Sequence, residues 1–480
     1  DGYVLTNFPY LNNGPKDLIG NSGKGKEYAY RSYFGRVMYS YADRYLFQAN
    51  IRHDGSSRFA KKHRWGTFPS FSAGWVLSEE NFMKNLNWDW LSFLKIRATW
   101  GALGNERIGD FPYMSTIAFG NTIFYQNNGI YFDQTASQQK YAIENVTWEK
   151  TESTDIGLDI SFLNNRLRVN GDYYWKNTKD MLLAMAIPDF LGFSDPDVNA
   201  GKMSTKGYEL NVSWNDHIGD FSYGIAINFS DFTSKMGDLQ GTQFLGDKVK
   251  MEGSEFNEWY GYVSDGLFLT EEDLKNSPKI NDKNTQLGDI KYKDISGPDG
   301  VPDGKISPEY DRVLLGSSLP HFLYGGNINL GYKNFDLSLA FQGVGKQNAR
   351  LAREMVEPFR NNYGNFPAII DGNYWSPYNT DEQNAVAKYP RLTHVNKSSN
   401  YAMSDYWLFN GGYFRLKNIT LGYTFPKEWM NAIGIKGARI YASASDLFCL
   451  SKYPKGWDPE MGVSEYPITT SILLGVSVNF

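Results

Sequence analysis

The acidic stretch around Asp294, Asp299 and Asp303 holds residues that could bind a hard metal ion. Calcium prefers several carboxylate and carbonyl oxygens, and a turn punctuated by glycines brings such oxygens together. An EF-hand loop needs a ligand at every second position and a late Glu, whereas Pro298 and Pro302 interrupt that order here. Two interpretations stay open: a calcium site, which is the one cofactor that the sequence suggests, or a tight turn in which Asp side chains accept backbone hydrogen bonds.

Aromatic residues in long polar stretches form a second set with possible binding chemistry. Their flat apolar faces could stack on sugar rings or on peptide side chains at the mouth of a binding site. The same rings could instead pack the loops together or cover an interface with a lid protein. The candidate ligand-binding residues are Trp259, Tyr260, Tyr363, Tyr374 and Trp375.

Catalytic patterns are missing from the sequence, so we expect a protein that is not an enzyme. The five histidines are dispersed and show no HExxH or paired-ligand spacing, and neither a phosphate loop nor a nucleophile elbow appears. The net charge is only −5 with both signs interspersed, which argues against nucleic acid as a partner. The single cysteine, Cys449, excludes intramolecular disulfides. The histidines are His53, His63, His217, His321 and His394.

Strict alternation of apolar and polar residues is the strongest pattern along the chain. It indicates β-strands whose two faces lie in different environments. In the stretch 221–230, for example, Phe221, Tyr223 and Ile225 alternate with Ser222 and Gly224. Aromatic residues make up 16% of the chain and are accompanied by 47 glycines, which also favours strands and turns over helices. We count about fourteen such strands.

The connections between these strands alternate in length. Short turns such as Asn164-Asn165 and Lys333-Asn334 alternate with long connections near 178–202, 232–318, 345–405 and 450–468. A transmembrane β-barrel has this organisation, with short turns at one rim and long extracellular loops at the other. A soluble sandwich would place Lys and Glu on the polar face, whereas the polar face here is rich in Asn, Ser, Gly and Gln. The repeat of about 40 residues that is typical of a propeller does not appear.

The end of the chain also favours the membrane barrel. Ile472, Leu474, Val476, Val478 and Phe480 occupy one face of the last predicted strand. An amphipathic strand that closes on an aromatic residue is typical of outer-membrane barrels, so we interpret Val476, Val478 and Phe480 as a barrel-assembly signal. No run of 18 apolar residues is present, but a transmembrane strand needs only about 10 residues with alternate ones apolar.

Several long segments of the sequence carry the patterns of one protein family. Examples are FGRVMYSYADRYLFQANIRHDGSSRF at 34–59, RWGTFPSFSAGWVLSEENF at 64–82 and YWLFNGGYFRLKNITLGYTFP at 406–426. Further stretches of this kind lie at 93–105, 148–182, 261–268, from 288 onward, and at 438–448. Together they resemble the SusC/RagA-type TonB-dependent outer-membrane transporters of Bacteroidota-like bacteria, and the resemblance covers almost the whole chain.

The resemblance implies an all-β, antiparallel up-and-down transmembrane barrel of about 22 strands, of which residues 1–480 would be the C-terminal part. We expect the plug domain and the first strands to be absent from this chain. The resemblance also implies active import of glycans or oligopeptides, powered through TonB contacting the plug, with a SusD-like surface lipoprotein acting as a lid. The alternative function is a soluble β-rich carbohydrate-binding protein or glycosidase.

Overall fold

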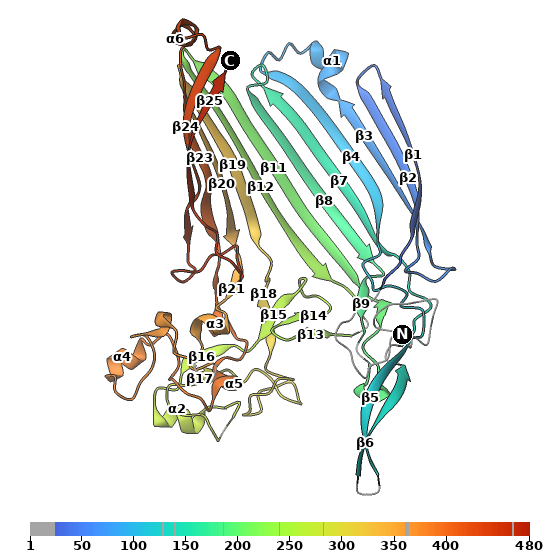
Figure 1. The fold of residues 1–480 in the computed structure, drawn as a ribbon, viewed down its shortest axis with the longest axis vertical. Helices are drawn as coiled ribbons and strands as arrows, with labels where there is room; N and C mark the ends of the chain where they lie inside the picture. The colour runs from blue at the N-terminus through green and yellow to red at the C-terminus, as the bar shows by residue number, and fades with distance from the viewer. Residues whose placement is uncertain are drawn as a thin grey trace.

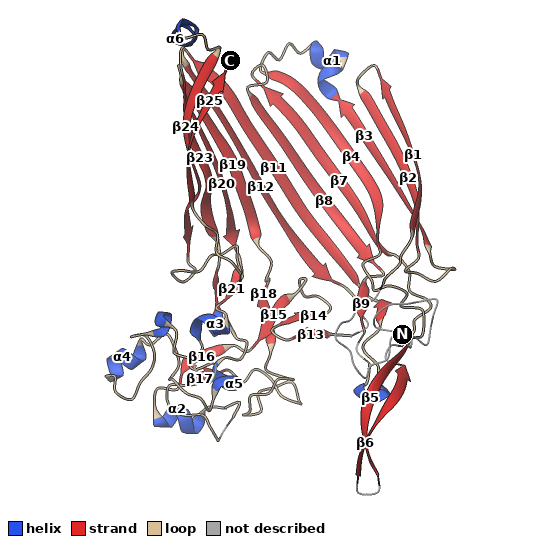
Figure 2. Cartoon of the chain, viewed as in Figure 1, coloured by secondary structure: helices blue, strands red, loops and turns tan. Residues whose placement is uncertain are grey.

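The computed structural model of the chain describes residues 25–126, 129–138, 141–185, 187–239, 241–281, 283–360, 364–462 and 465–480. The main feature of the described chain is one large, curved β-sheet with folded loops at one end (Figure 1). The helices are short and are confined to turns and connections (Figure 2). Within the described part, no helix is both long enough and apolar enough to cross a membrane.

Within the described residues, the large sheet contains thirteen antiparallel strands, and each strand pairs with its neighbours in chain order. The alternation in the sequence predicted about fourteen strands, so that count is nearly correct. β1 and β25 form the two edges of the sheet. The strands are β1 (Tyr30–Tyr41), β2 (Tyr45–Ser56), β3 (Trp65–Val76), β4 (Leu91–Asn105), β7 (Glu149–Phe162), β8 (Leu167–Lys179), β11 (Lys202–Ile218), β12 (Phe221–Met236), β19 (His321–Tyr332), β20 (Phe335–Lys346), β23 (Tyr413–Thr424), β24 (Gly437–Ser451) and β25 (Ser471–Asn479).

Strand register places the apolar residues on one face of this sheet. Residues that pair across antiparallel strands project to the same side, so one row of paired residues shows the character of a face. On one face, Ile160 pairs with Val169, Val169 with Val212, and Val212 with Ile227. On the other face, the adjacent row runs through Asp159, Asn170, Asn211 and Asn228. The sheet thus has one apolar and one polar face, which is the pattern of a barrel wall between lipid and a watery lumen.

Tight turns join the strands at the rim that carries α1 and α6 (Figure 1). Asn164 and Asn165 both have a positive φ in the β7–β8 turn, as does Lys333 in the β19–β20 turn. Asn adopts this left-handed conformation more readily than most residues, because its short amide can bond to the local backbone. Both turns lie where the sequence predicted them.

The opposite rim carries much longer connections, which include small elements of their own (Figure 1). They span 106–148, 180–201, 237–320, 347–412 and 452–470. The first of these, with its β5–β6 hairpin, was not among the long connections expected from the sequence. Their strands are β5 (Ile117–Gln126), β6 (Gly129–Gln138), β9 (Leu182–Ala184), β10 (Asp197–Asn199), β13 (Gln243–Leu245), β14 (Lys248–Lys250), β15 (Glu258–Gly261), β16 (Ser264–Leu267), β17 (Ile290–Tyr292), β18 (Val313–Gly316), β21 (Asn348–Arg350) and β22 (Leu408–Asn410).

The helices divide between the two rims. Two of them belong to the short-turn rim: α1 (Asn81–Lys84) between β3 and β4, and α6 (Lys427–Ala432) between β23 and β24. The other four lie in the two longest connections: α2 (Glu271–Asn276), α3 (Arg353–Val356), α4 (Asp381–Ala385) and α5 (Lys397–Asn400). Most of the small elements outside the large sheet therefore lie at the long-connection rim.

Candidate functional site

The two longest connections pack against each other and form one folded body, which we call the loop unit (237–320 and 347–412). It has a hydrophobic core in which Trp407, Val356 and Ile370 are almost completely buried. The Tyr292 hydroxyl in one connection donates a hydrogen bond of 2.7 Å to the carbonyl of Ser399 in the other. Burial of these apolar side chains gives the loop unit its own source of stability, independent of the sheet.

One fully buried carboxylate links the two halves of the loop unit. Asp289 is fully buried, and its oxygens accept hydrogen bonds from Arg391 at 2.7 Å, Asn396 at 2.8 Å and Asn400 at 2.9 Å. Asn400 in turn accepts a hydrogen bond from the backbone N–H of Ile290. A buried charge is tolerated only when it is paired and hydrogen-bonded in this way. The network therefore sets the position of the segment that carries Arg391.

The neighbouring Gly288 sets the position of Trp375. Its φ of +82° lies in the left-handed region, and a Cβ added there would stand 2.3 Å from the Trp375 ring. Both the backbone conformation and the close approach of the indole thus require glycine. The backbone N–H of Trp375 also donates to the carbonyl of Tyr389 at 3.0 Å.

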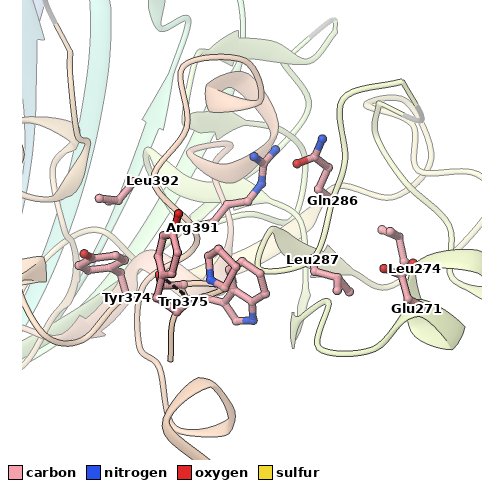
Figure 3. A pocket seen from close by; sticks show the side chains of 11 residues that line it. Glu271, Leu274, Gln286, Leu287, Tyr374, Trp375, Arg391 and Leu392 are labelled. Carbon is pink, nitrogen blue, oxygen red and sulfur yellow. Dashed lines mark hydrogen bonds between the residues drawn. The ribbon is translucent and has the colours of Figure 1, made fainter. Parts of the chain in front are cut away.

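This packing leaves a pocket of about 580 Å³ in the loop unit. Figure 3 shows Glu271 and Leu274 of α2 on one wall, and Tyr374 and Trp375 on the other. Tyr378 also lines the pocket and is 96% exposed. The volume lies within the usual range for a small-ligand site, and aromatic faces bordered by polar groups suit a sugar ring. The lining residues are Glu271, Leu274, Gln286, Leu287, Tyr374, Trp375, Ser376, Pro377, Tyr378, Arg391 and Leu392.

The structure brings two of the five predicted ligand-binding aromatics together in this pocket, Tyr374 and Trp375. Trp259 lies elsewhere in the loop unit, with the Lys248 ammonium 4.6 Å from its ring centroid and its Nε1 donating to the carbonyl of Asn348. Tyr260 is covered on one face by the Arg312 guanidinium, at 4.6 Å. Tyr363 lies outside the described residues. The role of all five in ligand binding stays a prediction.

The predicted calcium residues lie in a connected set of turns. One oxygen of Asp294 accepts the backbone N–H of Gly304 at 2.6 Å, and one of Asp303 accepts that of Lys305 at 3.0 Å. The fully buried Asp311, which the sequence analysis did not single out, accepts the N–H groups of Ile295 and Ser307, each at 2.7 Å. In the described part of the chain, no three His, Cys, Asp or Glu residues are grouped closely enough to hold a metal ion. Calcium binding at Asp294, Asp299 and Asp303 stays a prediction.

The three residues of the predicted assembly signal lie at one edge of the large sheet. β25 pairs with β24 through Val476 opposite Ile440 and Val478 opposite Ala438. Val476 is 71% exposed and Phe480 82% exposed, on a strand that has one neighbour. The role of Val476, Val478 and Phe480 in barrel assembly stays a prediction.

The ion clusters on the polar face of the sheet were not expected from the sequence. Arg97 of β4 reaches Asp155 at 3.3 Å, Asp159 at 3.4 Å and Asp172 at 2.6 Å. The alternation places each of these residues on the polar face of its own strand. It does not reveal the register between neighbouring strands, so it could not show that the charges meet.

A second cluster holds the β24–β25 connection against the same polar face. Arg415 of β23, whose side chain is 3% exposed, pairs with Asp458 at 2.5 Å and with Glu460 at 2.8 Å. Gln342 of β20 also donates to Glu460, at 3.0 Å. This connection is therefore anchored to the wall by charge-assisted hydrogen bonds, which are stronger than neutral ones.

Comparison with known proteins gives consistent matches. Residues 2–447 match the family model described as TonB dependent receptor-like, beta-barrel. The TonB-dependent receptor SusC of Bacteroides thetaiotaomicron is 32% identical over 468 residues, which are 94% of this chain and 43% of that protein. TonB-dependent receptor P3 of Formosa agariphila is 31% identical over 453 residues, or 89% of this chain and 42% of that protein. The chain thus spans less than half the length of these relatives.

Among solved structures, the RagAB peptide transporter superposes with a TM-score of 0.76 and 23% identity. The superposition covers 98% of this chain and 49% of that chain. A structure of the RagAB peptide importer in its open-open state gives a TM-score of 0.75. At 23% identity, this structural similarity shows a shared fold.

Proposed function

The chain belongs to the TonB-dependent receptor-like β-barrel family, of the SusC/RagA type, and on that premise we propose that it imports nutrients across the outer membrane. One observation carries the proposal: thirteen strands in chain order form a wall with an apolar and a polar face, and one rim bears a folded loop unit. The apolar face suits lipid, and the polar face suits a water-filled or plugged lumen. The loop unit provides a place for ligand capture at the mouth.

Glycans are the cargo that the pocket favours. Trp375 and Tyr374 offer aromatic faces, while Glu271, Gln286 and Arg391 offer hydrogen-bonding groups at the edge of the pocket. Sugar rings combine weakly polar C–H faces with a rim of hydroxyl groups, so they match this combination. Oligopeptides are the second candidate, since the structural neighbour RagAB is named a peptide transporter.

Energy and ligand capture would come from partners. TonB would act through a plug domain, and a SusD-like lipoprotein would close over the long-connection rim as a lid. The support is membership of the family and the exposure of Tyr378 and other loop residues on that rim. A hinged lid of this kind would capture the ligand before it enters the lumen.

Binding to purified full-length protein in detergent would test the cargo. We expect Trp375→Ala to weaken the binding of neutral oligosaccharides by about tenfold, because a central aromatic contact contributes more than 1 kcal/mol. Trp429→Ala is the matched control, since Trp429 is 59% exposed on α6 at the opposite rim. Calorimetric titration with a mixed oligosaccharide panel and a mixed peptide panel gives the readout. Binding of peptides alone would replace glycans with oligopeptides as the cargo, and an unchanged affinity in Trp375→Ala would remove the pocket from the proposal.

A further inference from the structure

A second hollow of about 460 Å³ lies in the loop unit, and cationic groups dominate its walls. Four cationic side chains and two carboxylates face it. The cations are Lys248 of β14, Arg350 of β21, Arg353 of α3 and Arg360, and the carboxylates are Asp247 and Glu354. An excess of cations around a hollow raises the local concentration of anions.

Lys248 has an aromatic neighbour and lacks an ion-pair partner. Its ammonium lies 4.6 Å from the centroid of the Trp259 ring, and no carboxylate in the described parts of the chain forms an ion pair with it. Burial lowers the pKa of Lys248, because a desolvated ammonium is less stable in its charged form. An anion placed in the hollow would restore the stability of that charge.

Arg350 has an unused donor at the same hollow. Its side chain is only 12% exposed; one terminal nitrogen pairs with Asp247, and the other donates to the carbonyl of Tyr401 at 3.3 Å. The Nε group is buried and has no acceptor among the residues described. A buried N–H without an acceptor costs free energy that a suitable ligand oxygen would recover.

The other two cations on the walls already have carboxylate partners. Arg353 pairs with Glu357 at 2.6 Å, and Arg360 pairs with Glu354. Among the cations that line the hollow, Lys248 therefore has no carboxylate partner, and Arg350 has a buried Nε group without an acceptor. One carboxylate has two oxygens, so it can accept a hydrogen bond from each of two donors.

We propose that this hollow binds the carboxylate of an acidic sugar residue in the imported glycan, with Lys248 and the Arg350 Nε group as its donors. The inference rests on the proposed glycan import and names a substrate class for it. Gln347 and Ser318 also line the hollow and supply polar groups of the kind that sugar hydroxyls contact. The larger pocket with Trp375 would then bind a ring by stacking, while this hollow selects for charge.

Two probes with the same linkages test the charge selection: a hexamer of galacturonic acid, and the same hexamer with its carboxyl groups reduced to neutral alcohols. We expect the full-length protein in detergent to bind the acidic hexamer about tenfold more tightly at low salt, since a charge-assisted hydrogen bond contributes on the order of one decade in affinity. Raising the salt concentration should reduce this preference. Calorimetric titration gives both affinities.

Two variants test whether the hollow causes the preference for the acidic hexamer. Lys248→Gln should abolish this preference, whereas Lys250→Gln should retain it. Lys250 is a close match, because it lies on the same strand, over the ring of Phe256 at 5.0 Å, and its pKa is also lowered by burial, yet it does not line the hollow. Arg350→Lys keeps a positive charge and removes the Nε donor, so it should lose part of the preference.

The outcomes separate this inference from the proposed function. Equal affinity for the two hexamers, or an unchanged preference in Lys248→Gln, would overturn the anion site and leave glycan import standing. Failure of both hexamers and of the neutral panel to bind would count against glycan import, and the inference would fall with it. Binding of hexaglutamate that depends on Lys248, without binding of either hexamer, would overturn the sugar assignment in favour of acidic peptides.

Discussion

At the scale of single residues, Asp289 stabilises the loop unit because its buried carboxylate is the shared acceptor for Arg391, Asn396 and Asn400. Removing one partner of a buried ion pair costs about 3–5 kcal/mol, since the other charge is left unpaired. We therefore expect Asp289→Ala to increase hydrogen exchange in 284–292 and 388–401 and to weaken oligosaccharide binding, because Arg391 lines the pocket. Glu309→Gln is the control on an exposed carboxylate. Equal exchange in the two variants would contradict the central position of Asp289.

Glu258 presents the opposite case, a carboxylate that burial destabilises. It is 9% exposed, and burial raises the pKa of this carboxyl, although the backbone N–H of Glu255 donates to it at 2.7 Å. A raised pKa in the folded state means that the charged form costs stability. This cost appears as the pH rises above about 4.3, the ordinary pKa of Glu, and is complete above the folded pKa.

Glu258→Gln should consequently stabilise the β13–β15 region by about 1 kcal/mol at pH 7.5, since the neutral amide keeps an acceptor without the buried charge. Hydrogen exchange of residues 245–261 measures the effect. The difference from the unmodified protein should shrink as the pH falls towards 4. Glu252→Gln, at an exposed position on the same connection, should change exchange at neither pH. Destabilisation by Glu258→Gln at pH 7.5 would show that the charge itself is needed.

At the scale of elements, the β24–β25 connection depends on its ionic attachment to Arg415. Burial opposes ionisation of Asp458, but hydrogen bonds from Arg415 outweigh it and hold the pKa of Asp458 below its ordinary value. A lowered pKa adds stability above the unfolded pKa of about 3.9, and this stability is lost as the pH falls through the folded value. The attachment should therefore hold at neutral pH and weaken in acid below about pH 4.

Asp458→Asn should release this connection at pH 7.5. The substitution removes one carboxylate partner of the buried Arg415 guanidinium, and this loss costs about 3 kcal/mol of folding free energy. Hydrogen exchange in 452–462 is expected to rise in the variant, while exchange in the middle of β23 and β24 stays low. Glu465→Gln, on an exposed side chain of the same connection, serves as the control. Unchanged protection of 452–462 in Asp458→Asn would mean that packing alone holds the connection.

Strands and short turns were predictable from the sequence because their pattern is local. Alternation at 221–230 predicts both faces of β12, and Asn164-Asn165 and Lys333-Asn334 identify turns without knowledge of distant residues. The loop unit was not predictable in this way. Asp289 and Arg391 are separated by about a hundred residues in the chain, and neither lies in a periodic segment that would indicate their contact. Tyr374 and Trp375 could be selected as aromatic loop residues, but the partner walls of their pocket come from α2 and the 286–287 segment.

At the scale of the whole molecule, the large sheet is a single layer, so its stability depends on what each face contacts. Leu210, at the middle of β11, pairs with Phe229 on the apolar face and is 40% exposed. Its neighbour Asn211 lies on the polar face and pairs with Asn170 and Asn228. These two positions have the same depth in the sheet and differ only in the face that they occupy.

This pair allows a direct test of which face meets lipid. Leu210→Arg should reduce the amount of folded protein in the outer membrane, because an arginine at the middle of a lipid-facing strand costs about 2–4 kcal/mol. Asn211→Arg should be tolerated, since the added charge enters a face that already carries ion pairs such as Arg97 with Asp172. The measurement is the heat-modifiable, folded fraction of the full-length protein on a gel after extraction from the membrane. Equal losses in the two variants would show that both faces exclude charge, and a greater loss in Asn211→Arg would reverse the assignment of the lipid face.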